Sequence, residues 1–349
     1  MQRRSFLGAS AAVGAAVLVG CHRASPRERV MSAIARTVSD GVTEMLAQTK
    51  SLEDATSALE QNASAALVAR SQELFRQTAI LWKRVGTFRD GPFQEQNALL
   101  RVTRYPARAR VIEAVLAESR PLDAGRVAEL GSGEKGLYAI EYLLFDSSTE
   151  TASSRLLGAK GPRARALLAG LSREVTSLGD KIAVVLGRRG TRLNEELLQN
   201  PQRGLGRLVN TLIEGLEVMA EAQLGMIYRL SEVNHLDRAS VEGFASGISH
   251  RLALARLEGT ERLYRGGHDN VSELVRSASP NADASVRERL DNALASLRGL
   301  KMPLEEVAQR ERLRLQEAYL KVKSLETGMK VHLPSALGIS ITFSSTDAD

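Results

Sequence analysis

Apolar residues recur every three or four positions along most of the chain after residue 26, which is the spacing of one face of an α-helix. In the window 55–86, for example, Leu67, Leu74 and Leu81 follow this spacing. The pattern predicts helices over 27–49, 55–86, 106–119, 134–146, 162–198, 203–231, 247–265, 281–297 and 303–327.

Glycine and proline mark the breaks between these segments. Asp90-Gly91-Pro92 and Asn200-Pro201 interrupt helices, Pro106 suits a first helical position, and Gly161-Pro162 marks the start of a second half. We therefore predict an all-α protein of two packed bundles, each of about four helices. The N-terminal bundle is expected over 27–150 and the C-terminal bundle over 160–332.

The C-terminal segment follows a different pattern. From Leu337 to Ser344 apolar residues alternate with small polar ones, a period of two that is typical of a strand or an extended end. We predict an extended tail over 333–349.

The first 20 residues have the features of an export signal. Arg3 and Arg4 precede Ser5-Phe6-Leu7, as in a twin-arginine signal, and a small apolar run leads to Leu18-Val19-Gly20-Cys21, which resembles a bacterial lipobox. Cys21, the only cysteine, would then carry the lipid anchor. His22 follows it where retention in the inner membrane usually requires aspartate. We therefore expect a periplasmic protein anchored by its lipid to the outer or the inner membrane, with the outer membrane favoured.

Composition agrees with a helical protein outside the bilayer. The chain is 43% hydrophobic and 25% charged but only 4% aromatic. Removing Arg3 and Arg4 with the signal lowers the formal net charge from +6 to +4, and the remaining arginines are scattered instead of clustered. A nucleic-acid partner is therefore not expected.

One acid stands out in this pattern. Residues 137–145 are apolar and aromatic nearly all round, and Glu141 is their only charge. A helix of this kind is buried, so Glu141 is expected inside the protein. Because an isolated buried carboxylate is costly, it requires a partner: a hydrogen-bond donor, a proton or a metal ion.

The segment Gly136-Leu137-Tyr138-Ala139-Ile140-Glu141-Tyr142 resembles the signature helix of the imelysin-like family, whose pattern is Gly-x-His-x-x-Glu. Tyr138 stands where the family has histidine. Weaker similarities follow in order along the chain. They are Trp82-Lys83-Arg84-Val85, Arg104-Tyr105-Pro106, Glu214-Gly215-Leu216-Glu217, Ser246-Gly247-Ile248-Ser249 and Leu337 to Phe343.

The resemblance implies two helical bundles with a site between them. Its binding cleft would include Gly136, Tyr138, Glu141, Ser246 and Ser249, and Glu141 would be the candidate metal ligand. Imelysin-like proteins are bacterial envelope proteins that are often tied to iron uptake, so iron is the cofactor or cargo to consider. The family was first catalogued as metallopeptidases.

The residues themselves favour no hydrolase. The five histidines, His22, His235, His250, His268 and His332, form no His-Glu-x-x-His motif. Glu214, Glu217 and Glu221 share one helix face, where they could hold a hard cation, but a solvated face with arginine partners is the simpler interpretation. For Tyr138, a hydroxyl that donates to the Glu141 carboxylate and a ligand-facing role are both open.

Ser246 and Ser249 stand beside His250 but precede a helix, so we expect one of them to be its N-cap, with hydroxyls in the cleft as the second possibility. Three functions follow. The first is a non-enzymatic lipoprotein of iron uptake that binds iron, a haem-like ligand or a partner. The others are a metallopeptidase and a helical adaptor for another envelope protein.

Overall fold

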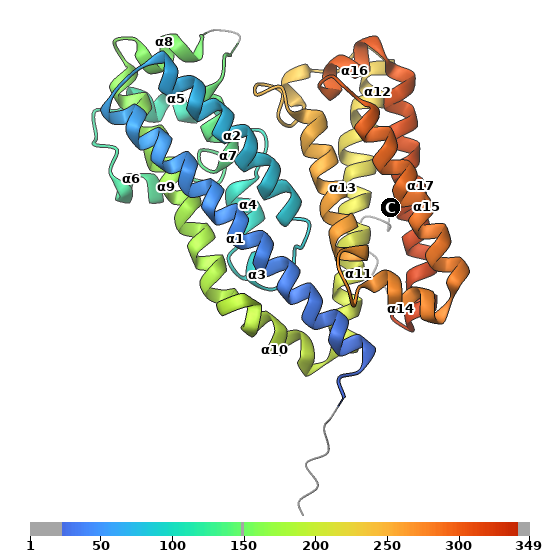
Figure 1. Cartoon of the computed structure of the whole chain (residues 1–349). Coiled ribbons are helices and arrows are strands. Elements are labelled where there is room, and N and C mark those ends of the chain that lie inside the picture. Colours follow the sequence, from blue (N-terminus) through green and yellow to red (C-terminus); the bar gives the residue numbers. More distant parts are fainter. Residues whose placement is uncertain (1–22, 148–149, 341–349) are drawn as a thin grey trace, which may run out of the picture.

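The computed structural model describes residues 23–147 and 150–340, and within these ranges the chain forms helices and no strand. The predicted signal, Cys21 and residues 341–349 lie outside the described residues. The prediction of an all-α fold is confirmed. Two groups of long helices stand side by side (Figure 1).

The first bundle is built on α1 (Pro26–Gln61), which packs against α2 (Ala65–Val85) and α9 (Gly161–Leu186). The shorter helices of this half pack around those three or join them. They are α3 (Pro92–Glu95), α4 (Ala98–Val102), α5 (Ala109–Ala117), α6 (Ala124–Ala128), α7 (Leu137–Leu144), α8 (Ala152–Leu157), η1 (Arg188–Gly190) and α10 (Thr191–Gln199).

The second bundle begins with α11 (Pro201–Glu217), which continues through a π-helical segment, η2 (Val218–Gly225), into α12 (Met226–Glu232). After the short turn η3 (Arg238–Ser240), α13 (Ser249–Arg265) packs against α2 of the first bundle. The bundle is completed by α14 (Val271–Ala278), α15 (Pro280–Gly299), α16 (Leu304–Arg310) and α17 (Arg312–Leu337).

The bundle boundary differs from the prediction. Helix α9 was expected to open the C-terminal bundle, but it runs along α1 and so belongs to the first (Figure 1). Gly161 and Pro162 do begin a helix, with proline in its first turn. A glycine-proline pair indicates where a helix starts, but it carries no information about which other helices that helix will pack against.

One predicted helix break is absent, and one observed break was not predicted. The chain does not break near residue 50, because Leu52, Ala55 and Leu59 continue the buried stripe of α1 up to the N-cap Ser64 of α2. The predicted helix 162–198 is instead divided at Gly187 and Gly190, which both have positive φ. At Gly190 a Cβ would lie 2.6 Å from the carbonyl oxygen of Ala35, so only glycine allows this close approach to α1.

Two segment ends need correction as well. Helix α5 begins at Ala109, not at Pro106. Helix α17 runs to Leu337, so residues 333–337 are helical and not extended as predicted. The reason is that Leu325, Met329, Leu333 and Leu337 are buried at a spacing of four, a helical stripe that overlaps the start of the alternating pattern.

Candidate functional site

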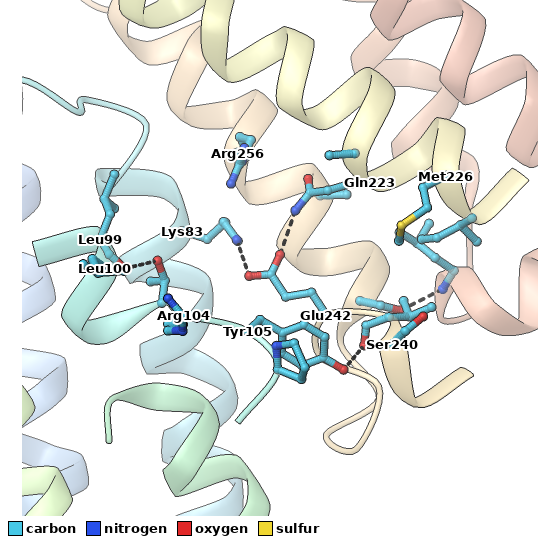
Figure 2. A pocket seen from close by; sticks show the side chains of 18 of the residues that line it. Lys83, Leu99, Leu100, Arg104, Tyr105, Gln223, Met226, Ser240, Glu242 and Arg256 are labelled. Atoms are coloured by element: carbon cyan, nitrogen blue, oxygen red, sulfur yellow. Dashed lines mark hydrogen bonds and ion pairs between the residues drawn. The ribbon is translucent and has the colours of Figure 1, made fainter. Parts of the chain in front are cut away.

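A cavity of about 730 Å³ lies between the two bundles (Figure 2). The first bundle supplies its wall from the end of α2, from α4 and from the loop 103–106. The second bundle supplies η2, the start of α12, the loop 240–242, α13 and Leu304. Because both halves form its walls, any group bound here would contact both bundles.

Glu242 is the polar centre of this cavity. It accepts hydrogen bonds from the Tyr138 hydroxyl and the Lys83 ammonium group. Gln223 Nε2 donates to its second oxygen at 2.7 Å, and Figure 2 shows this bond and the one from Lys83. Burial acts to raise the pKa of Glu242, but the nearby charges of Lys83 and Arg256 and these hydrogen bonds outweigh it, so the pKa lies below its ordinary value. Glu242 is therefore ionised at neutral pH.

The lysine of this pair is buried as well. The Lys83 side chain is 8% exposed, and burial lowers the pKa of its ammonium group to about 8, although the charge of Glu242 acts in the opposite direction. At pH 7 both members of the pair carry their charge. Gln223 reaches the pair from η2, and π-helical segments often mark functional positions in helical proteins.

Tyr138 is buried in the bundle interface and packs edge-to-face on Tyr105, with ring centroids 4.8 Å apart. Its hydroxyl donates to Glu242, so of the two roles left open by the sequence, the hydrogen bond to Glu141 is not formed. The backbone of α7 directs the two side chains to different parts of the second bundle. Burial, followed by the charge of Glu242, holds the pKa of Tyr138 well above its usual range, so the hydroxyl remains a donor.

Glu141 is 4% exposed, which confirms the prediction that it is buried with a polar partner. That partner is Ser246, whose backbone N–H donates to Glu141 Oε1 at 3.1 Å and whose hydroxyl donates to the same oxygen. Burial, with smaller contributions from the charges of Glu242 and Glu305, raises the pKa of Glu141 to about 7 against the opposing effect of these hydrogen bonds.

Ser246 and Ser249 do not have the predicted capping role. The N-cap residue of α13 is Ile248, and no side chain caps this helix. Both hydroxyls instead donate hydrogen bonds to carboxylates. Ser249 donates to Glu305 at 2.7 Å, and Ser246 donates to Glu141. Ser249 also lines the cavity.

Gly136 positions α7 instead of lining the cavity. Its φ is +78°, and a Cβ there would lie 2.5 Å from the carbonyl oxygen of Arg101 and 2.7 Å from that of Val102. The glycine thus lets α7 start directly against the end of α4. Among the predicted cleft residues, only Ser249 lies in the cavity wall, while Tyr138, Glu141 and Ser246 form the contact behind it.

Comparison with known proteins identifies the family. A family model described as Imelysin, of the peptidase M75 class, matches residues 38–328. The chain belongs to the imelysin family. The predicted resemblance is therefore confirmed.

Solved structures share the imelysin fold of this chain. An iron-regulated protein A precursor from Parabacteroides distasonis superposes with a TM-score of 0.77 at 14% identity, over 91% of this chain and 97% of that chain. An imelysin-like protein from Psychrobacter arcticum gives 0.71 at 18% identity, over 92% and 99%. A search of curated proteins gives no match.

The side chains of the imelysin signature are engaged in hydrogen bonds within the protein. Within residues 23–147 and 150–340, no group of three or more His, Cys, Asp or Glu side chains is arranged to hold an ion. Glu141 Oε1 is occupied by Ser246, and Tyr138, at the histidine position of the signature, donates to Glu242. The donor set around Glu141 therefore does not fit a metal ion.

The acidic stripe of α11 and η2 is largely ion-paired. Glu217 lies 3.6 Å from Lys330, and Glu221 lies 3.0 Å from Lys323 and 3.1 Å from Arg229. The simpler interpretation, a solvated face with basic partners, describes these two acids. Their partners are mainly lysines, where arginines were expected.

The sequence reasoning did not single out the charged residues of the cavity. Lys83 was noted only within a family motif, and Arg89, Glu242 and Arg256 were not noted. Glu242 lies in a loop, and its contact with Tyr138 joins residues 104 positions apart. Helical spacing carries no signal for such a contact.

Proposed function

We propose that this imelysin-family protein is a non-enzymatic binding protein of the bacterial envelope that serves iron uptake. The observation that carries the proposal is the cavity between the bundles, with a charged centre, Glu242, that is held by residues from both halves. Concave sites with apolar walls and a few fixed polar groups are typical of small-ligand binding. The link to iron rests on the family resemblance and on the name of the Parabacteroides relative.

The predicted contact residues support the cavity from behind. Glu141 and Ser246 join α7 to the segment before α13, and Arg76 of α2 donates to the carbonyl oxygen of Ser246 at 3.1 Å. These contacts set the spacing of the bundles at the cavity. Gly136, Tyr138, Glu141 and Ser246 would then act on binding by positioning the walls, and Ser249 would act within the wall.

The binding proposal is tested with the full chain purified in detergent. We expect its melting temperature to rise with at least one of ferrous salt, ferric salt, haem or ferric citrate, because a ligand that binds only the folded state stabilises it. Ala222→Trp should abolish that shift, since Ala222 lines the cavity and is exposed to it. Val184→Trp, at a residue that is 68% exposed and outside the cavity, is the matched control. No shift with any of these ligands would overturn the proposal.

The envelope location belongs to the same proposal. No helix among the described residues is both long and apolar enough to span a bilayer, so attachment would depend on Cys21. We expect the chain to take up radiolabelled palmitate in bacteria and to fractionate with the outer membrane. Cys21→Ser should lose the label, and a label that persists in this variant would reject the predicted anchor.

The family description makes a metallopeptidase the alternative to test. Such an enzyme would cleave a peptide library in a reaction that chelators stop and that Glu141→Gln abolishes. A wild-type protein that leaves the library intact while binding a ligand would favour the binding role.

A further inference from the structure

The cavity carries more positive charge than its own carboxylate can neutralise. Four cationic side chains line it, and they are Lys83, Arg89, Arg104 and Arg256. The only acid in the lining is Glu242, and both of its oxygens are already used, one by Lys83 and Tyr138 and the other by Gln223. Because Lys83 is paired with Glu242, the three arginines leave the cavity lining with a net charge of three positive units.

None of these guanidinium groups has a hydrogen bond or an ion pair in the described part of the chain. Other arginines near the interface do: Arg84 pairs with Glu258 at 2.8 Å and Arg101 with Glu174 at 2.6 Å. Arg256 is half-buried on α13, and its side chain points toward the space above Lys83 and Glu242 (Figure 2). Glu242 attracts Arg256 without a direct contact, and a guanidinium drawn partly out of water without a hydrogen-bonded anion is unfavourable.

The three arginines are placed at different depths. Arg256 comes from the second bundle, Arg89 follows α2 in the first and is half-buried, and Arg104 is exposed in the loop after α4. Leu99, Leu100 and Met226 supply apolar surface to the same cavity (Figure 2). A small molecule with a short carbon skeleton and several anionic groups would satisfy both features.

We propose that the cavity binds a small anion with two or more carboxylate or phosphate groups, held by Arg89, Arg104 and Arg256. Guanidinium groups match both kinds of oxyanion, because two parallel N–H donors meet two oxygens. The inference rests on the proposed function, in which this cavity is the binding site. A ferric ion held in a polycarboxylate chelate belongs to the same chemical class, since the chelate presents its carboxylates to the protein.

The experiment is isothermal titration of the full chain in detergent with citrate, ferric citrate and inorganic phosphate. We expect at least one of them to bind, and the arm that binds separates free polycarboxylate, metal chelate and phosphate. Arg256→Gln should weaken binding at least tenfold, since charge-assisted hydrogen bonds to a guanidinium would be lost. Arg104→Gln, at an exposed position that makes no hydrogen bond or ion pair among the described residues, should weaken it severalfold and make it less sensitive to salt.

Arg120→Gln is the matched control, because Arg120 is exposed, pairs with Glu129 and lies outside the cavity. Its affinity should equal that of the wild type. Without ligand, Arg256→Gln should melt close to the wild-type temperature, since Arg256 makes no hydrogen bond or ion pair among the described residues and the variant loses only the longer-range attraction to Glu242.

The outcomes separate the two proposals. If a ligand binds, Ala222→Trp blocks it and both arginine variants keep full affinity, the cavity is the site but the anion inference is wrong. If none of the three anions binds while a simple iron salt does, the inference also fails and the binding role stands. Haem has two carboxylates of its own, so haem binding overturns the inference only if Arg256→Gln and Arg104→Gln both keep full affinity for it. If no ligand of either set binds, both proposals fall.

Discussion

Tyr138 donates its hydroxyl hydrogen bond to Glu242 of the second bundle and not to Glu141, which lies one helical turn away on α7. Glu141 in turn accepts from Ser246, also of the second bundle. Tyr138 and Glu141, which lie on one short buried helix, thus each make a separate hydrogen bond across the bundle interface. We infer that α7 fixes how the two halves meet around the cavity.

Tyr138→Phe tests this crossing. The substitution removes one donor from a buried carboxylate, which costs about 1–3 kcal/mol of unfolding free energy. Tyr142→Phe is the matched control on the same helix, because its hydroxyl donates to Glu113 at 2.6 Å in a more exposed place, where water can replace the bond. Urea unfolding of both variants measures the difference. Equal losses would contradict the special role of the Tyr138 contact.

Glu141→Gln should change how stability depends on pH. The pKa of Glu141 is raised to about 7 in the folded protein from an ordinary value of 4.5, so between these values the folded state binds more protons than the unfolded state. Stability contributed at this site is therefore present below pH 4.5 and is lost as pH rises to 7, by about 3 kcal/mol.

Glutamine stays neutral and still accepts from Ser246, so the variant should match the wild type near pH 5 and be more stable at pH 8. The difference between the two proteins in urea unfolding at these two pH values measures the effect, since other titrating groups cancel. A constant difference across the range would show that Glu141 does not titrate there.

The helices could be predicted because their cause is local. Buried stripes such as Leu325, Met329 and Leu333 repeat at the helical period, and capping residues such as Ser25 precede the first turn. The membership of α9 in the first bundle could not be predicted in the same way. It depends on which apolar faces fit one another, and that choice is made between segments far apart in the chain.

The site was predictable in one part only. The burial of Glu141 could be predicted because the residues around it in the helix are apolar on nearly every side, and such a helix lies inside a protein. Its partner Ser246 lies 105 positions away, and the role of Glu242 follows from contacts that three separate elements bring together. Long-range polar contacts of this kind have no periodic signature.

Gly136→Ala should be among the most damaging single-methyl changes in the chain. The φ of +78° and ψ of −168° at this position belong to a region that only glycine enters freely. The new Cβ would also lie closer than 3 Å to the backbone carbonyl oxygens of Arg101 and Val102 at the end of α4. We expect a loss of about 3 kcal/mol or more. Gly206→Ala, in α11 with no atom within 4 Å of its Cβ, should instead stabilise by up to about 1 kcal/mol. Thermal melts of the two variants give the comparison, and a mild effect at Gly136 would mean that α7 can start elsewhere.

Lys83→Met tests the buried ion pair at the centre of the cavity. Removing the ammonium group leaves Glu242 buried without its main counter-charge, which costs about 3 kcal/mol. The adjacent Arg84 offers the matched control, because its pair with Glu258 is about 30% exposed and Arg84→Met should cost at most about 1 kcal/mol. The double variant Lys83→Met/Glu242→Gln should recover part of the unfolding free energy that Lys83→Met loses, since no unpaired carboxylate then remains at residue 242. Urea unfolding of the four proteins, wild type included, decides between the outcomes. If the double variant were no more stable than Lys83→Met alone, the cost would come from lost packing around the lysine stem and not from the orphaned charge of Glu242.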